Sequence, residues 1–366
     1  MKILIVTGIW PPDVGGPASH APEAAEELVR RGNNVVVLTT ATRAPAPRPY
    51  PVRWVSRRLP RGARHAAVAA VVSRLSAQAD VVYATSMIGR SAFAARAPLV
   101  VKVAGDPAYE RSLRRGLYTG TLAEFQTASV GARAEALRRW RTMTARRAAQ
   151  LVCPSGFLRS IVVDWGISAD RVGVLPNPIP PIPELPSRNE LRASFGVDAG
   201  PLIAFAGRLT PAKDLGVLIA AVERLEDATL LVAGDGELRA ELGSRASPRT
   251  RFLGALPRDR VLELFAAADL AALSSAWENF PHAVVEALAV GTPVVATRVG
   301  GVPEIVDDGE NGALVPPGDV DAFADALRRC LGDERLRANA APSVRRFSPQ
   351  LVFDELEAIL RRAVGR

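Results

Sequence analysis

The sequence predicts an α/β fold of two Rossmann-like, doubly wound domains. Short apolar runs of strand length alternate with helical patterns along the chain, which is typical of parallel sheets built from βαβ units. The chain has 366 residues, 48% of them hydrophobic, which suits two domains of ordinary size. A segment at 176–186 contains six prolines in eleven residues. Because such chain is extended and semi-rigid, we expect it to link the two domains.

The first domain is expected over residues 1–180. Apolar, often β-branched runs predict strands at 3–7, 35–40, 52–55, 81–83, 99–103, 151–155 and 172–175. Apolar residues at helical spacing predict helices at 18–31, 63–77, 86–95, 132–149 and 156–164, the last capped by Ser155. Residues 111–130 are expected to form a loop.

A glycine-rich stretch, Gly8–Pro17, lies between the first strand and the first helix. The backbone N–H groups of such a loop and the helix N-terminus after it can hold an anion. Its spacing is not the Gly-x-Gly-x-x-Gly of dinucleotide-binding proteins, which argues against a dinucleotide-dependent oxidoreductase. A structural turn explains the stretch about equally well.

The second domain is expected over residues 181–348. The same patterns predict strands at 202–206, 229–233, 251–254, 269–274 and 293–297. They predict helices at 189–195, 215–225, 258–267 and 319–331, a helix that begins at Pro281, and a last helix at 349–362.

Two glutamates stand out near the strand predicted at 293–297. Glu278 lies in the loop before a helix, and Glu286 lies inside that helix, which Gly291 and Pro293 end. After the strand, Gly300-Gly301 permits backbone geometry or a close ligand approach that other residues resist. Since ligands of open α/β sheets bind at the carboxyl ends of the strands, both carboxylates are predicted to border such a site.

Two basic residues, Arg208 and Lys213, follow the strand at 202–206. A guanidinium group can bind two phosphate oxygens and a lysine can neutralise a third, so this loop is a candidate diphosphate site. Lys213 is also one of only three lysines, with Lys2 and Lys102, against 43 arginines.

The string from Ser274 to Glu304, with its Glu-x7-Glu spacing and its Gly-Thr-Pro-Val-Val-Ala-Thr and Gly-Gly-Val-Pro-Glu segments, resembles the retaining glycosyltransferases of group 1 and family 4 type. The Gly-Arg-Leu-x3-Lys pattern at 207–213 resembles the same family. The resemblance implies the GT-B fold, in which two Rossmann-like domains face each other across a cleft and a last helix, here 349–366, packs back on the first domain.

The resemblance also implies roles for individual residues. Glu286 would hold the ribose hydroxyls of a nucleotide-diphosphate sugar, and Glu278 would lie beside the donor sugar as a catalytic residue. Further donor-binding residues implied by the match are Gly16, Arg208, Lys213, Asn279, Phe280, Pro281 and Gly301. We expect metal-independent transfer of a hexose from a UDP- or GDP-sugar to a hydroxyl, with no metal site and no cofactor beyond this co-substrate.

Asp106 is the predicted catalytic or positioning group on the acceptor side. Many relatives carry a histidine after the corresponding strand, where this chain has Ala104-Gly105-Asp106. Asp106 is the nearest polar replacement, and it follows a strand, where active-site groups collect.

Charge divides the chain unevenly. Residues 1–180 have 25 basic and 11 acidic side chains, a net charge of +14, while residues 181–366 have a net charge of −6. The span from Leu28 to Ala79 has ten arginines and no acidic residue. This basic first domain fits an anionic membrane surface or acceptor, and it fits equally an arginine-rich solvated face.

The expected acceptor is a glycan, a lipid-linked molecule or a small molecule, and no nucleic acid is expected as a partner. Two separated cysteines, no signal peptide and no long apolar run indicate a cytoplasmic protein, peripheral to the membrane if it docks there. Two alternatives remain: a sugar-nucleotide epimerase of the same fold, and a non-catalytic nucleotide-sugar-binding protein.

Overall fold

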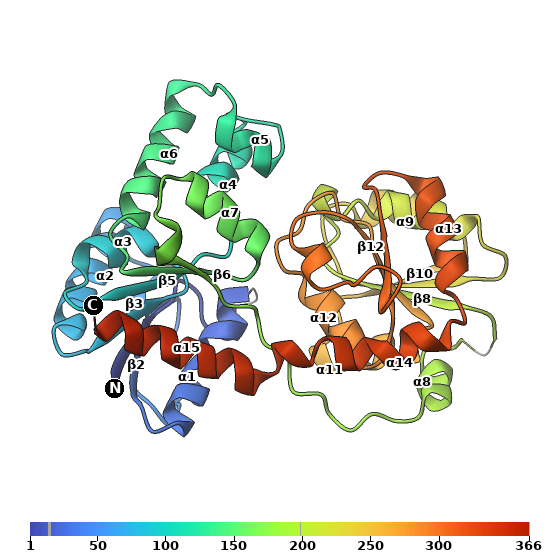
Figure 1. Ribbon diagram of the computed structural model, residues 1–366, viewed down its shortest axis with the longest axis horizontal. Helices are drawn as coiled ribbons and strands as arrows, with labels where there is room; N and C mark the ends of the chain where they lie inside the picture. The colour runs from blue at the N-terminus through green and yellow to red at the C-terminus, as the bar shows by residue number, and fades with distance from the viewer. Residues whose placement is uncertain (14–15, 198, 366) are drawn as a thin grey trace. The chain divides into compact units, whose positions relative to one another are not determined.

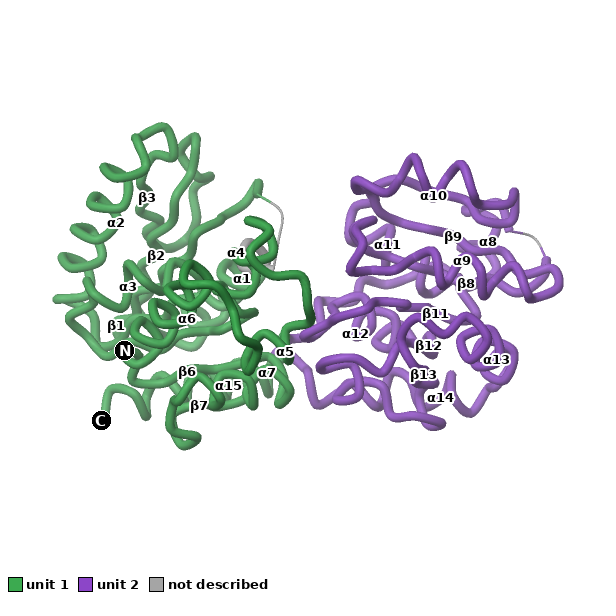
Figure 2. The backbone as a smooth tube through the Cα atoms, turned by 90° about the horizontal axis from the view of Figure 1, so that it is seen from above, with its two compact units in different colours: residues 1–177, 350–366 green, residues 178–349 purple. Residues whose placement is uncertain are grey.

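The computed structural model describes residues 1–13, 16–197 and 199–365, without the side chains of residues 16–19 (Figure 1). The chain forms two compact units, which Figure 2 colours separately. Unit 1 comprises Met1–Asn177 and Gln350–Arg366, and unit 2 comprises Pro178–Pro349. The sequence placed these divisions at 180 and 348, inside the proline-rich segment and before the last helix.

Unit 1 contains a seven-stranded parallel sheet with the order β3-β2-β1-β4-β5-β6-β7. The strands are β1 Lys2–Val6, β2 Asn34–Ala41, β3 Val52–Ser56, β4 Val81–Ala84, β5 Leu99–Lys102, β6 Gln150–Cys153 and β7 Val172–Val174. The helices are α1 Gly16–Arg30, α2 Arg61–Ser76, α3 Ile88–Ala94, α4 Pro107–Arg114, α5 Leu122–Thr127, α6 Ala132–Ala145, α7 Gly156–Asp164 and α15 Pro349–Val364. Strands β1, β4, β5 and β6 are buried on both faces, as their continuous apolar runs indicate.

Helix α15 packs against the rest of unit 1, where it shares a core with α1. Phe353, Leu356 and Leu360 of α15 share a buried core with Leu28 of α1 and with side chains of β1, β2 and β4. The contact also has polar bonds, since Arg31 pairs with Asp354, and the Asn33 amide donates to Glu357 Oε1 at 3.1 Å. The final helix is therefore a structural part of the first domain.

The segment 111–130 is more regular than the sequence reading allowed. It contains the end of α4 and all of α5, and α4 contacts α6 (Figure 1). Thr121 and Glu124 form a capping box at the start of α5. This Thr-x-x-Glu signature was present in the sequence, so the loop prediction was wrong for α5 because the capping signal was overlooked.

Unit 2 contains a six-stranded parallel sheet with the order β10-β9-β8-β11-β12-β13. The strands are β8 Leu202–Ala206, β9 Thr229–Ala233, β10 Thr250–Gly254, β11 Leu270–Leu273, β12 Val294–Thr297 and β13 Gly312–Val315. The helices are α8 Arg188–Ser194, α9 Leu215–Glu223, α10 Arg239–Arg245, α11 Arg258–Ala267, α12 His282–Ala289, α13 Val320–Cys330 and α14 Glu334–Ser343.

Three elements of unit 2 were missed: α10, β13 and α14. Strand β13 is only four residues long and pairs with β12 from Val294↔Gly312 to Thr297↔Val315. Helix α14 has a weakly apolar sequence but is capped by Asp333, whose carboxylate accepts from two backbone N–H groups. For β13 and α14, tertiary pairing and capping outweigh a weak local pattern.

Within the described residues, no helix combines the length and the apolar character needed to cross a membrane. The same residues contain no group of three or more histidine, cysteine or carboxylate side chains arranged to hold a metal ion.

Candidate active site

Apart from Glu286, which lies in α12, the donor-binding residues predicted in unit 2 lie in loops after three neighbouring strands. Strands β8, β11 and β12 are adjacent and parallel, so their carboxyl ends meet at one edge of the sheet. The loop after β8 carries Arg208 and Lys213, the loop after β11 carries Glu278, and the loop after β12 carries Gly301. The fold thus brings together residues that are up to 93 positions apart in sequence.

These three loops are bonded to one another. The Ser274 hydroxyl donates to the carbonyl oxygen of Lys213 at 3.0 Å, and the Ala276 N–H donates to the carbonyl of Ala212 at 2.9 Å. The Thr297 hydroxyl donates to the carbonyl of Ser275 at 2.6 Å. These bonds use buried hydroxyl and backbone groups, so the relative positions of the loops are determined by the fold itself.

Glu278 and Lys213 form an ion pair at this edge. The Lys213 ammonium donates to Glu278 Oε1, which also accepts from the Ser275 hydroxyl at 2.7 Å. The two side chains are 23% and 11% exposed, so the pair is largely shielded from water. Held in this way, the Glu278 carboxylate can orient the Lys213 ammonium toward a second anion.

Glu286 lies in α12 and pairs with Arg258, the first residue of α11. Arg258 Nε donates to Glu286 Oε1 at 3.1 Å. Burial raises the pKa of Glu286, and the Arg258 guanidinium opposes that shift. Sequence reasoning missed Arg258, because only the packing of α11 against α12 shows that it meets the second glutamate.

Arg208 is exposed in the loop after β8, which lies directly against the loop after β9. A Cβ atom at Gly234, where φ is +146°, would lie 1.8 Å from the carbonyl oxygen of Gly207. One at Gly236 would lie 2.4 Å from the carbonyl oxygen of Leu209. Only glycine permits this approach, and it fixes the course of the loop that presents Arg208 and Lys213.

The other residues predicted to bind the donor are buried side chains or would act through their backbone groups. Asn279 and Phe280 are both buried, and the Phe280 ring packs edge-on against Phe347 at 5.2 Å between centroids. Pro281 is the N-cap of α12. The Gly301 N–H donates to the carbonyl of Glu278 at 3.3 Å, so it has an acceptor within the chain. The surroundings of Gly16, at the start of α1, lie outside the described residues.

Asp106 lies in unit 1 and is 1% exposed. One carboxylate oxygen caps α4 by accepting from the Ala108 N–H at 2.8 Å and the Tyr109 N–H at 3.2 Å. The other accepts from Arg141 at 2.5 Å and from the Gln126 amide at 3.2 Å. Both oxygens therefore have structural partners, which favours a role in joining α4 to α6. The catalytic role stays a prediction.

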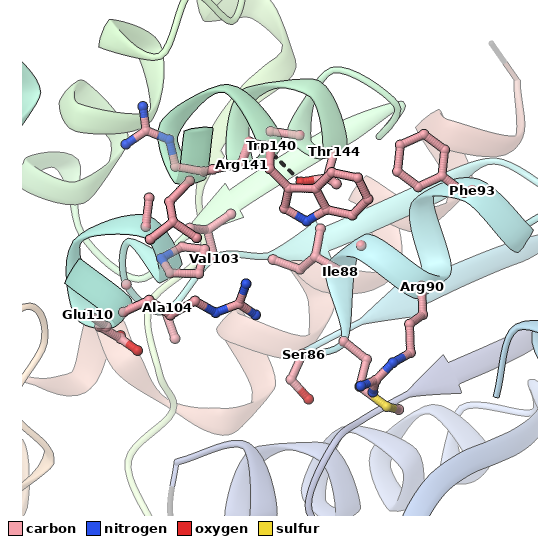
Figure 3. A pocket seen from close by; sticks show the side chains of 18 of the residues that line it. Ser86, Ile88, Arg90, Phe93, Val103, Ala104, Glu110, Trp140, Arg141 and Thr144 are labelled. Carbon is pink, nitrogen blue, oxygen red and sulfur yellow. Dashed lines mark hydrogen bonds between the residues drawn. The ribbon is translucent and has the colours of Figure 1, made fainter. Parts of the chain in front are cut away.

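A pocket of about 860 Å³ opens in unit 1 among α2, α3, α4 and α6, beside the ends of β4 and β5 (Figure 3). Trp140 from α6 and Ile88 and Phe93 from α3 form its apolar side, and Glu110 from α4 lies at another part of the wall. Although its side chain is 54% exposed, desolvation by the surrounding wall raises the pKa of Glu110; the Asp106 carboxylate adds to that shift, and Arg114 and Arg111 oppose it.

Glu110 was not singled out in the sequence. A Cβ atom at Gly105 would lie 2.7 Å from its Oε1, so this carboxylate stands at the end of β5, where the acceptor-side group was expected. It lies in the first turn of α4, four residues after the Asp106 cap, and belongs to no motif.

Comparison with known families covers both units. The family described as Glycosyltransferase Family 4 matches residues 14–181, and the one described as Glycosyl transferases group 1 matches residues 187–347. The D-inositol 3-phosphate glycosyltransferase of Xylanimonas cellulosilytica is 37% identical over 215 residues, 54% of this chain and 51% of that protein. The protein of the same name from Mycolicibacterium smegmatis is 36% identical over 194 residues, 49% of this chain and 44% of that protein. The chain spans about half the length of these curated relatives.

Solved structures share the fold over nearly the whole chain. Anabaena HepE, in a complex with UDP-glucose, is 24% identical with a TM-score of 0.79, covering 99% of this chain and 100% of that chain. Sucrose-phosphate synthase from Thermosynechococcus elongatus is 18% identical with a TM-score of 0.80, covering 100% and 99%. Because the two family matches account for both units and these structures repeat both parallel sheets, the chain belongs to the group 1 and family 4 glycosyltransferases and has their GT-B fold.

Proposed function

We propose that this protein transfers a sugar from a nucleotide-diphosphate sugar to a hydroxyl group of an acceptor, with retention at the anomeric carbon. The donor is a UDP- or GDP-sugar, and the acceptor is a glycan, a lipid-linked molecule or a small molecule. The observation that carries the proposal is the pairing of Glu278 with Lys213 at the sheet edge that also presents Arg208. The complex of Anabaena HepE with UDP-glucose, a protein of the same fold, supports a nucleotide-sugar donor.

The proposed chemistry depends on the charge that develops on the departing diphosphate. Arg208 and Lys213 are the cations that would stabilise this charge, and stabilisation is strongest where water is excluded and the donors are already in place. Lys213 meets that condition, because Glu278 and the loop bonds around it hold its ammonium in position. Glu278 would in turn lie beside the donor sugar.

Glu286 is proposed to accept hydrogen bonds from the ribose hydroxyls of the donor. Arg258 holds one oxygen of its carboxylate, and among the described residues none is recorded bonding to the other oxygen, which can therefore accept from a ligand. Charge-assisted hydrogen bonds of this kind contribute about 1.5–3 kcal/mol each.

The test is titration calorimetry of the full chain with UDP-, GDP- and ADP-sugars. We expect Arg208→Ala, Lys213→Ala and Glu286→Ala each to weaken donor binding by roughly ten- to hundredfold. Glu241→Ala, an exposed glutamate on α10, is the matched control and should bind as the wild type does. A triple variant that binds every nucleotide sugar normally would show that the donor site lies elsewhere.

Three further measurements separate this reaction from its rivals. Transfer to an added acceptor distinguishes a transferase from a sugar-nucleotide epimerase, which yields an isomerised donor alone, and from a binding protein, which yields neither. The anomeric configuration of the product tests retention. Activity in the presence of EDTA tests metal independence, and a loss that Mg²⁺ or Mn²⁺ restores would contradict it.

A further inference from the structure

The mouth of the unit 1 pocket carries a cluster of positive charge. Arg61 and Arg64 come from α2, Arg90 from α3 and Arg111 from α4, and all but Arg64 line the pocket. Burial and the charges of the other three arginines lower the pKa of Arg90. Three guanidinium groups from α2 and α4 thus lie close enough to Arg90 to repel its charge.

No carboxylate among the described residues forms an ion pair with any of these four arginines, although Arg64 donates to the carbonyl of Arg57 at 3.0 Å. Glu110 is the one acidic residue on the pocket lining that the structure describes, and it pairs with Arg114 at 3.7 Å. Some other arginines of the first domain do have acidic partners. Arg57, for example, binds Asp13 at 2.5 Å.

The placement of Arg61, Arg90 and Arg111 on one pocket lining separates them from a merely solvated basic face. A solvated face spreads its charges along one helix toward water, whereas these three side chains come from three separate helices to one concavity. Converging, unmatched positive charge raises the local concentration of anions and can bind them by charge-assisted hydrogen bonds.

The other part of the pocket is apolar and aromatic. The Trp140 and Phe93 rings pack with their centroids 5.6 Å apart, yet they remain 47% and 46% exposed. Exposed aromatic rings beside a pocket offer a surface for an apolar or ring-shaped body. The pocket volume of about 860 Å³ lies within the range of about 300–1,000 Å³ that is usual for small-molecule sites.

We propose that this pocket binds the acceptor, and that the acceptor carries a phosphate group on an apolar or ring-shaped body. Arg61, Arg90 and Arg111 bind the phosphate, and Trp140 with Phe93 contacts the body. This rests on the proposed glycosyltransferase function and adds the substrate class to it. The phosphate belongs either to a soluble phosphate ester or to a lipid headgroup, which share the same chemistry.

The first experiment measures binding of phenyl phosphate to the full chain by calorimetry, beside inorganic phosphate and phenol. We expect phenyl phosphate to bind more tightly than either fragment, because it fills both parts of the pocket. Arg90→Gln should weaken it roughly ten- to hundredfold, and Arg61→Gln and Arg111→Gln, which alter exposed side chains and leave folding intact, should act in the same direction.

Arg74→Gln is the matched control, since Arg74 is an exposed arginine on α2 outside the pocket lining. A second arm measures co-sedimentation with vesicles of phosphatidylcholine containing phosphatidylglycerol, beside phosphatidylcholine alone. Binding of phenyl phosphate that depends on the three arginines supports a soluble phosphate ester. Arginine-dependent binding to the anionic vesicles alone supports a lipid headgroup.

Two results would overturn the proposal: binding of neither probe, or equal losses in Arg74→Gln and the pocket variants. Titration with UDP- and GDP-sugars in the same preparations keeps the two ideas apart. Normal donor binding with no phosphate binding refutes the acceptor class alone, whereas absent donor binding refutes the proposed function.

Discussion

Asp106→Asn is the substitution that best distinguishes a structural from a catalytic role for this residue. Asparagine keeps a side-chain oxygen for the N-cap of α4 but removes the charge opposite Arg141. The Asp106 and Arg141 side chains are 0% and 7% exposed, so Arg141 would be left as a buried, unpaired cation. Breaking such a pair from one side costs about 3–5 kcal/mol.

That loss corresponds to roughly 6–20 °C in the unfolding temperature of a unit of this size. Tryptophan fluorescence is a suitable probe, because four of the five tryptophans lie in unit 1, and Trp165 lies 4.3 Å from the Arg141 guanidinium. Asp106→Ala should cost about 1 kcal/mol more, since it also removes the cap. Adding Arg141→Met to Asp106→Asn should recover most of the loss, because no charge is then left unpaired.

Asp164→Asn, an exposed position at the end of α7, is the control and should change the free energy of unfolding by less than about 0.5 kcal/mol. The structural argument is refuted if Asp106→Asn unfolds within about 1 kcal/mol of the wild type. A large fall in kcat at unchanged stability would instead support the catalytic role predicted from the sequence.

Three other predictions concern charged groups. Burial lowers the pKa of Lys102 to about 7, whereas an unfolded lysine titrates near 10.4. Between these two pH values the Lys102 amine is protonated in the unfolded chain and neutral in the folded one. The free energy of unfolding should therefore rise with pH across this window. In urea titrations, Lys102→Met should have a higher free energy of unfolding than the wild type near pH 7.5 and should lose this pH dependence. Lys2→Met, at an exposed position, is the control and should show neither effect. Arg258→Gln should weaken donor binding less than Glu286→Ala does, because it removes a positioning partner and leaves the carboxylate itself; equal losses would mean that Arg258 contacts the donor directly. Glu110→Gln should lower kcat with donor affinity unchanged, and unaltered turnover would remove Glu110 from the acceptor side.

Much of the fold was predictable because its strands are short, buried and strongly apolar. Strand β8 was placed at its observed bounds, as was α11. The errors fall where local pattern is weak: β13 depends on pairing with β12, and α14 depends on the Asp333 cap. The pattern of apolar residues along the sequence does not show which strand β13 pairs with.

The site was predictable where contiguous residues carry it and less so where packing assembles it. Glu278 and Lys213 were both named from motifs, yet these residues are 65 positions apart and form an ion pair only because β8 and β11 are adjacent in the sheet. Arg258 and Glu110 were missed because neither belongs to a motif. Asp106 was named for its position after β5, but its orientation depends on Arg141, which is contributed by a different helix.

The hydrogen bonds among the loops after β8, β11 and β12 have a consequence for protein engineering. Since the Ser274 hydroxyl holds the backbone of Lys213 and the Thr297 hydroxyl holds that of Ser275, each loop serves as the template on which its neighbour is shaped. Grafting one loop from a relative would leave its neighbours without their supports. An exchange of donor preference between relatives should therefore transplant all three loops as a single block, together with the serine and threonine that join them.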